Sequence, residues 1–267
     1  MKASIKRLLP PALWSTIARS YDACLRLPEL PGTAFHPWRR ASIRNLKAMR
    51  DSQCHRRCFI IGNGPSLREI DLSRLQGEFT FGLNRIYLLF PEMGFSTSYY
   101  VSINDLVIQQ CASEIRALPM PKFLAWHARR FIQPTADTSF LYTSYTGPGF
   151  NRNASGRLWE GATVTYVALQ LAFHMGFEKV ILVGVDHNFV SKGKPNQTVT
   201  STGDDPNHFS PAYFGKGFQW QLPDLQTNEL AYRMAKSAYE LAGRQVLDAT
   251  RGGRLTVFPK VDYDSLF

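Results

Sequence analysis

Short apolar runs that end in glycine or polar residues recur along the chain and predict the strands of a sheet. The run VILVGV at residues 180–185 is continuously apolar, as in a parallel strand buried on both faces. Residues 97–103 instead combine β-branched and aromatic side chains, which also favour a strand. The runs that predict strands are residues 58–61, 79–82, 97–103, 122–126, 180–185, 245–248 and 255–258.

Helical spacing of apolar residues predicts the layers that cover this sheet. Residues 163–175 carry one apolar stripe and are followed by Gly176, a typical helix stop. The same spacing predicts helices at residues 106–118 and 226–242, and a shorter helix at residues 41–50. The alternation of strand, glycine turn and helix predicts an α/β fold, with a Rossmann-like, mostly parallel sheet and helices on both faces.

Two long stretches lack periodicity. Residues 127–158 and 188–225 are rich in glycine, proline and polar residues. Long irregular stretches inside a compact domain are often functional. We therefore expect residues 127–158 to cover the site as a loop-rich lid, and residues 188–225 to be a second long loop.

Polar residues follow four of the predicted strands. They are Asn63, Asn84, Asn104 with Asp105, and Asp186 with His187. Because the carboxyl ends of parallel strands share one edge of the sheet, we expect these side chains to converge there. Asparagine offers a donor and an acceptor without charge, which suits the sugar and base of a nucleotide better than a metal ion.

The segment after the first strand, Gly62-Asn63-Gly64-Pro65-Ser66, predicts a tight strand-to-helix turn. Glycine at positions 62 and 64 would allow positive φ and close approach of a ligand to the backbone. Pro65 suits the first turn of a helix. The same residues are also compatible with a turn that binds nothing. Because the turn lacks GxGxxG and the chain lacks GxxxxGK[ST], NAD binding and a P-loop kinase are disfavoured.

The positive charge of the chain is concentrated at its amino terminus. Of the net charge of +10, residues 1–50 supply +8, from ten Lys or Arg against two acidic residues. No nucleic-acid recognition module accompanies this charge, so we expect no nucleic-acid partner. Residues 1–50 form a basic extension of a domain at residues 51–267, compatible with peripheral contact to an anionic membrane or with a helix packed on the domain. Four cysteines without framework spacing indicate a reducing, cytoplasmic setting.

Three segments together resemble a known family. Residues 61–71 (IGNGPSLREID) with Asn84, residues 163–186, and residues 205–209 (DPNHF) are similar to the bacterial sialyltransferases that build surface oligosaccharides. The wider superfamily shares the GxGPSL turn and includes MptE-like 6-hydroxymethylpterin diphosphokinases and flagellin-glycosylating motility accessory factors. The resemblance covers residues 57–260.

The resemblance implies a GT-A-variant fold and an inverting glycosyltransferase that needs no cofactor. A CMP-linked sugar would be the donor, and a glycan or lipid-linked molecule of surface polysaccharide synthesis the acceptor. His208 would be the general base. The family's paired tyrosines, which bond the leaving phosphate, are not evident, because Asn188 stands at the first such position; His187, Tyr213 or Lys216 would substitute. The implied nucleotide- and donor-binding residues are Gly62, Asn63, Gly64, Pro65, Ser66, Asn84, Asn104, Thr163 and Asp186.

Two other functions remain open. An MptE-like diphosphokinase would transfer pyrophosphate from ATP to a pterin-like alcohol, with Mg²⁺ on Asp105 and Asp186. A non-catalytic nucleotide-binding protein of the same fold is the other, since a fold does not determine a function.

Overall fold

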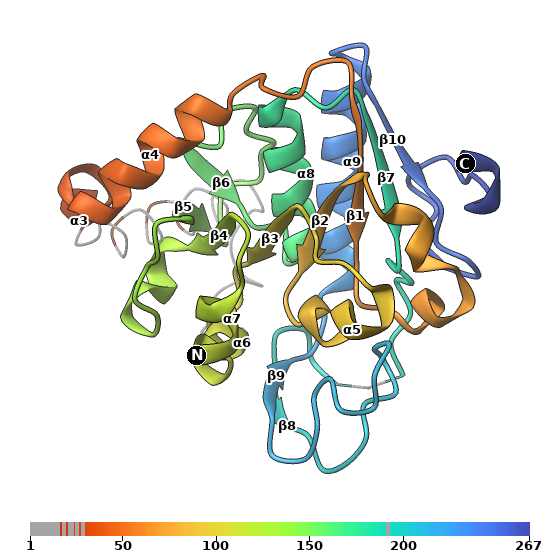
Figure 1. The fold of residues 1–267 in the computed structure, drawn as a ribbon. Helices are drawn as coiled ribbons and strands as arrows, with labels where there is room; N and C mark the ends of the chain where they lie inside the picture. The colour runs from red at the N-terminus through yellow and green to blue at the C-terminus, as the bar shows by residue number, and fades with distance from the viewer. Residues whose placement is uncertain (1–16, 18–19, 21–23, 25–26, 28–29, 191–192) are drawn as a thin grey trace.

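The computed structural model describes residues 17, 20, 24, 27, 30–190 and 193–267 (Figure 1). Within them, eight strands form one sheet in the order β10-β7-β1-β2-β3-β4-β5-β6, and every pairing is parallel. This confirms the predicted α/β fold. The sheet strands are β1 (Arg57–Ile61), β2 (Phe79–Leu83), β3 (Tyr99–Ser102), β4 (Lys122–Ala125), β5 (Thr138–Ser144), β6 (Arg157–Trp159), β7 (Lys179–Val183) and β10 (Gln245–Asp248).

The strand order reverses at β1. Strands β2 to β6 follow on one side of it, whereas β7 and β10 lie on the other. In open α/β sheets, ligands bind outside the carboxyl ends of the strands at such a switch point. We therefore expect the functional site to lie beside the residues that follow β1 and β7.

Helices cover both faces of the sheet. Right-handed crossovers place the connections from β1 to β5 on one face, and α8 and α9, which lead into β7 and β10, on the other. The helices are α3 (Leu30–Phe35), α4 (Pro37–Met49), α5 (Phe90–Met93), α6 (Asp105–Gln110), α7 (Ala112–Ala117), α8 (Val164–Met175) and α9 (Leu225–Glu240), with 3₁₀ turns at Pro65–Glu69, Leu72–Leu75, Ile86–Leu89, Trp126–Arg130 and Asp264–Leu266.

Helix α8 is the centre of the core. Its amino end is capped by the Thr163 hydroxyl, which accepts from the Thr165 N–H, and its carboxyl end by Gly176 at φ 96°. Residues from Thr165 to Met175 are all buried, so the helix is enclosed rather than amphipathic. His174 bonds the Leu46 carbonyl at 2.7 Å and joins α8 to α4.

The second long loop, residues 188–225, carries a small hairpin, and we call the described part of this loop the lid. Strands β8 (Thr198–Thr200) and β9 (Gln219–Gln221) pair antiparallel and lie beyond the main sheet, at the foot of Figure 1. The Gln110 side-chain amide of α6 bonds both the N–H and the C=O of Gln219, at 2.9 and 2.8 Å. The hairpin is thus fastened to the first half of the domain.

Three local expectations were wrong. Residues 127–158 are not a cover, because they supply β5 and β6 to the sheet. Residues 255–258 form no strand: Leu255 and Phe258 are buried, but the nearby backbone pairing is a single bridge between Asp248 and Lys260. The helix predicted at residues 106–118 is interrupted at Cys111 and becomes α6 and α7.

The described part of the basic segment packs on the domain. Arg39 of α4 is buried and donates to the carbonyls of Phe140 and Ser155, and Leu46 is in the core. Most of residues 1–29 lie outside the described residues, so membrane contact by that part stays a prediction. None of the helices among the described residues has the length and apolar character that a membrane span requires.

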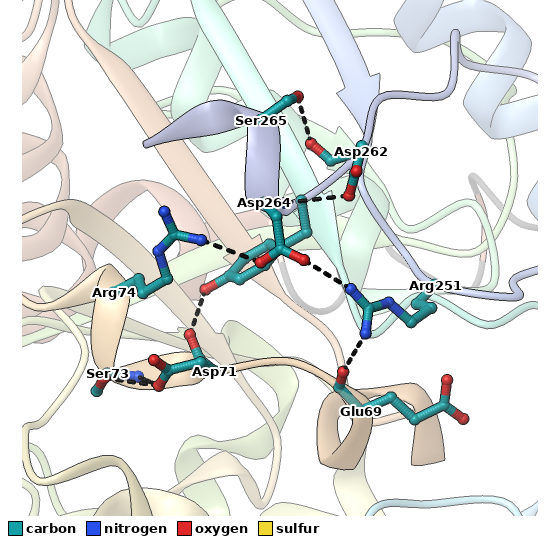
Figure 2. A network of polar contacts seen from close by, with 9 residues as sticks. Glu69, Asp71, Ser73, Arg74, Arg251, Asp262, Asp264 and Ser265 are labelled. Atoms are coloured by element: carbon teal, nitrogen blue, oxygen red, sulfur yellow. Dashed lines mark hydrogen bonds and ion pairs between the residues drawn. The ribbon is translucent and has the colours of Figure 1, made fainter.

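The carboxyl-terminal segment is fastened across the domain (Figure 2). Asp264 accepts from Arg74 at 3.0 Å and from Arg251 at 2.9 Å. The Tyr263 hydroxyl donates to the Asp71 carbonyl at 2.8 Å, and Arg251 also donates to the Glu69 carbonyl. We call this group the terminal clasp. It joins the 3₁₀ turns after β1 to the chain that follows β10.

Candidate active site

A cleft with two compartments opens at the switch point. The strand-end compartment is bounded by the turns after β1 and β7, and the Trp220 compartment by the lid and the end of β6. The residues that line both are Asn84, Thr163, Val164, Phe189, His208 and Asn228. The cleft is therefore continuous, with His208 at the junction.

The glycine turn is shaped by packing between two loops. A Cβ on Gly62 would lie 2.2 Å from the Gly184 carbonyl oxygen, and one on Gly64 would lie 1.7 Å from Asp186 Oδ2. Neither glycine has positive φ. The expectation that they serve left-handed backbone was therefore wrong: they are required because the turns after β1 and β7 touch.

Ser66 and Asp186 form a fixed pair beneath the strand-end compartment. The Ser66 hydroxyl donates to Asp186 Oδ2 at 2.8 Å, and its N–H donates to Oδ1 at 3.1 Å. Burial raises the pKa of the Asp186 carboxyl, and the bonds from Ser66 offset part of that rise. Both oxygens have a partner, so this carboxylate is a structural link between the turns after β1 and β7.

His208 is held by a carboxylate and by aromatic rings. Its Nδ1 lies 2.7 Å from Asp205 Oδ2, and its ring stacks on Tyr213 at 4.0 Å between centroids. Asp205 also accepts from the backbone N–H groups of Asn207 and Phe214. In the tautomer that donates Nδ1–H to Asp205, Nε2 carries the lone pair.

The loop that carries His208 docks on the glycine turn. The Phe209 N–H donates to the Asn63 carbonyl at 2.9 Å, and the Arg68 guanidinium donates to the Phe209 carbonyl. The lid histidine is thus placed by the glycine turn and by the 3₁₀ turn that follows it. This explains how residues 63 and 208 meet in one site.

Backbone strain gathers around the cleft. Among the described residues, six that are not glycine have positive φ, and four of them line the cleft: Asn84, Ala162, His187 and Asn196. Such conformations cost of order 1 kcal/mol each and persist where the surroundings impose them. The strain supports a functional role for the cleft.

The three asparagines that follow strands differ in whether their side-chain oxygen already has a hydrogen-bond partner among the described residues. Asn63 Oδ1 is buried and has no hydrogen-bond partner among the described residues. Asn84 Oδ1 accepts from the Ser102 hydroxyl at 3.1 Å. Asn104 caps α6 through Oδ1 and donates to Gln221 at 3.3 Å. Asn63 is therefore the asparagine with the clearest unmet acceptor for a ligand.

The three residues predicted to assist the leaving group lie at different distances from the cleft. His187 lines the strand-end compartment, with Nε2 3.4 Å from Glu229 Oε1. Tyr213 is buried behind His208, and its hydroxyl accepts from the Arg85 N–H at 3.3 Å. Lys216 is exposed, and neither compartment's lining includes Tyr213, Lys216, Pro65 or Ser66. Of the three candidates, His187 alone borders the cleft.

Sequence patterns missed a second group of titratable residues. Glu160 follows β6, lines the Trp220 compartment and is 2% exposed. His127 Nε2 lies 3.1 Å from Asp105 Oδ1, and Arg130 lies 2.8 Å from Asp105 Oδ2. A polar residue directly after a strand is the same signal that marked the asparagines, but β6 is three residues long and lacks an apolar run.

The charges in this group are coupled. Burial raises the pKa of the Glu160 carboxyl, and the charge of His127 offsets only part of the rise. Burial acts to lower the pKa of His127, but Asp105 and Glu160 outweigh it and hold that pKa above its ordinary value. Burial acts to raise the pKa of Asp105, yet His127 and Arg130 keep it below its ordinary range.

Replacing Glu160 with glutamine is expected to reduce the loss of stability between about pH 5 and about pH 8. Raised pKa values mean that the folded state binds protons at Glu160 and His127 that the unfolded state has already released. The unfolding free energy of the parent protein therefore falls as pH rises through this window. Glu160→Gln removes the titrating carboxyl itself and also removes part of the reason that the pKa of His127 is raised. Urea unfolding at several pH values measures this.

The exposed Glu240→Gln serves as the charge-matched control for that experiment. It removes the same charge from the surface and should leave the pH dependence as in the parent. Parallel pH profiles for the parent and Glu160→Gln would contradict the coupled group.

Comparisons with known proteins give a fold. No protein-family model matches the chain, and no curated protein matches it. Among solved structures, it is similar to the MAf glycosyltransferase from Magnetospirillum magneticum AMB-1, with a TM-score of 0.51 and 16% identity. The likeness covers 85% of this chain and 38% of that one, so this chain spans well under half of that protein. At such low identity the likeness shows the fold alone.

Proposed function

We propose that this protein is a glycosyltransferase that moves a sugar from a nucleotide-linked donor to an acceptor hydroxyl, with His208 as general base. The observation that carries the proposal is His208, oriented by Asp205, at the junction of the two compartments. A base between two substrate-sized compartments suits a transfer between two bound molecules. The glycosyltransferase of similar fold supports the same reaction class.

In this reaction His208 Nε2 takes the proton from the acceptor hydroxyl as its oxygen attacks the anomeric carbon. The bond from that carbon to the phosphate oxygen breaks, and the nucleotide departs with the electron pair. Attack from the side opposite the phosphate inverts the anomeric configuration. The donor lies in the strand-end compartment, where the Asn63 amide oxygen is unmet and α8 presents its amino end.

A donor with a single phosphate, such as a CMP-linked sugar, fits this lining best. The residues that line the two compartments include histidines and amides but no Lys or Arg among those described. The carboxylates that would hold Mg²⁺ for a diphosphokinase are engaged: Asp186 with Ser66, and Asp105 with His127 and Arg130. A lining without Lys or Arg among the described residues, together with carboxylates that are already engaged, favours a sialyltransferase-like reaction over pyrophosphate transfer from ATP.

The test is a thermal-shift screen with CMP, UDP, GDP and ATP, each with and without Mg²⁺. A ligand at about 100 times its Kd adds about 2.7 kcal/mol to the folded state. We expect stabilisation by CMP without metal, and its loss in Asn63→Leu, which is nearly isosteric but lacks the amide. Stabilisation by ATP with Mg²⁺ alone would favour the diphosphokinase, and no response at all would favour a non-enzymatic role.

A further inference from the structure

Glu160 is fixed in place with an unmet oxygen. Its N–H donates to the Ser144 carbonyl at 3.0 Å, and its carbonyl accepts from the Thr163 N–H at 3.1 Å, so the backbone is held on both sides. Glu160 Oε1 and Thr143 Oγ1 are both buried without a well-aligned hydrogen bond among the described residues. The hydroxyls of Thr143 and Tyr145 lie close enough to the carboxyl to lower its pKa, so a ligand's donors would take the place of these poorly aligned contacts. An unsatisfied buried polar atom costs about 1–3 kcal/mol, which a ligand's donors would recover.

The charges around Glu160 favour neither a cation nor an anion. Arg130 and His127 both lie against Asp105, and the raised pKa of His127 favours its charged form. Burial raises the pKa of the Glu160 carboxyl and so disfavours its charged form, which leaves an added cation little to pair with, and no Lys or Arg among the described residues lines this compartment to attract an anion. A neutral ligand that donates hydrogen bonds fits this balance.

A row of aromatic side chains extends from the Trp220 compartment to His208. Trp220 stacks on Phe214 at 5.4 Å between centroids, and Phe214 meets His208 edge-on at 4.8 Å. The amides of Asn104 and Gln221 stand beside Trp220 in the same lining. A flat apolar face combined with a few hydrogen-bonding groups suits a pyranose ring, which has apolar C–H faces and polar edges.

We propose that the Trp220 compartment is the acceptor subsite and binds a neutral sugar residue, whose hydroxyl groups donate to Glu160 while its ring lies against Trp220. The proposal rests on the proposed function and extends it by naming the acceptor class. Glu160 is here a binding residue, and the proton of the reacting hydroxyl goes to His208. A phosphate is left to the strand-end compartment, where α8 presents its amino end.

The test is ligand-observed NMR on the whole protein with CMP present. The probes are the methyl glycosides of glucose, galactose and N-acetylglucosamine, with glucosamine as the cation and glucuronate as the anion. We expect at least one neutral glycoside to bind and the charged sugars to bind less. Glu160→Gln should weaken that binding about tenfold and leave CMP binding as in the parent, and the exposed Glu240→Gln should change neither.

Trp220→Leu is the second variant and tests the aromatic face without touching the buried carboxylate. Unchanged binding of neutral glycosides in both Glu160→Gln and Trp220→Leu would overturn the inference, as would preference for a charged sugar or no sugar binding at all. If CMP binds but sugars do not, the acceptor inference fails while the proposed function stands. If sugars bind through Glu160 but no nucleotide binds, the sugar site stands and the transferase proposal fails.

Discussion

Replacing His208 with glutamine is expected to lower kcat by about 10²- to 10⁴-fold, the range that a positioned general base contributes. The KM for the sugar donor should change little, because the side chain that we propose to bind the donor is Asn63, in the strand-end compartment, and not His208. Initial rates over a range of donor and acceptor concentrations separate the two effects. In His208→Ala, free imidazole should restore part of the rate, since the space beside Tyr213 is open to it.

Asp205→Asn tests the orientation of the base rather than its presence. An amide N–H in place of the Asp205 oxygen would donate to Nδ1, which puts the proton on Nε2 and removes the base. The rate should therefore fall although the histidine remains. His55→Gln is the matched control, because His55 is exposed, pairs with Glu178 and lines neither compartment of the cleft. A base role is refuted if His208→Gln is as active as the parent.

Gly62→Ala is expected to destabilise the fold by about 3 kcal/mol, at the upper end of over-packing costs. The new Cβ would meet the Gly184 carbonyl oxygen at 2.2 Å, and this carbonyl, which accepts from the Gly64 N–H, has little room to retreat. Gly64→Ala should displace the Asp186 side chain instead and break its bonds to Ser66, so nucleotide binding should suffer with stability. Urea denaturation of the purified variants measures both.

Gly203→Ala is the control for these two substitutions. Nothing lies within 4 Å of its Cβ position, and its φ is not in the left-handed region. Its effect should stay within about 0.5 kcal/mol. If Gly62→Ala is as mild as Gly203→Ala, the contact between the two turns is not the reason for glycine at position 62.

The core of the sheet could be predicted because its strands are apolar on both faces. Residues 58–61 and 180–183 are fully buried, and their hydrophobic runs have no competing interpretation. Strand β5 was missed because it carries polar residues that partners elsewhere satisfy: Ser42 of α4 accepts from the Phe140 N–H, and Asn45 donates to Ser139. Such partners, about a hundred residues away in sequence, cannot be read from local periodicity.

The same limit applies to the site. Convergence of Asn63, Asn84 and Asp186 on the cleft followed from parallel topology, since strand ends share an edge. The pairing of Ser66 with Asp186, and of His127 with Asp105, depends on contacts between loops and could not be predicted from either loop alone. Glu160 was missed because neither its burial nor its neighbours are encoded in its local pattern.

The terminal clasp has a consequence for the order of events during synthesis. Arg74 and Asp264 are 190 residues apart in sequence, and β1 needs β7 as a neighbour on its open side. The turns after β1 emerge from the ribosome early, yet their partners arrive only near the end of translation. The nascent domain must therefore wait with the turns after β1 unpaired, exposed to chaperones and proteases, until residue 264 has been made.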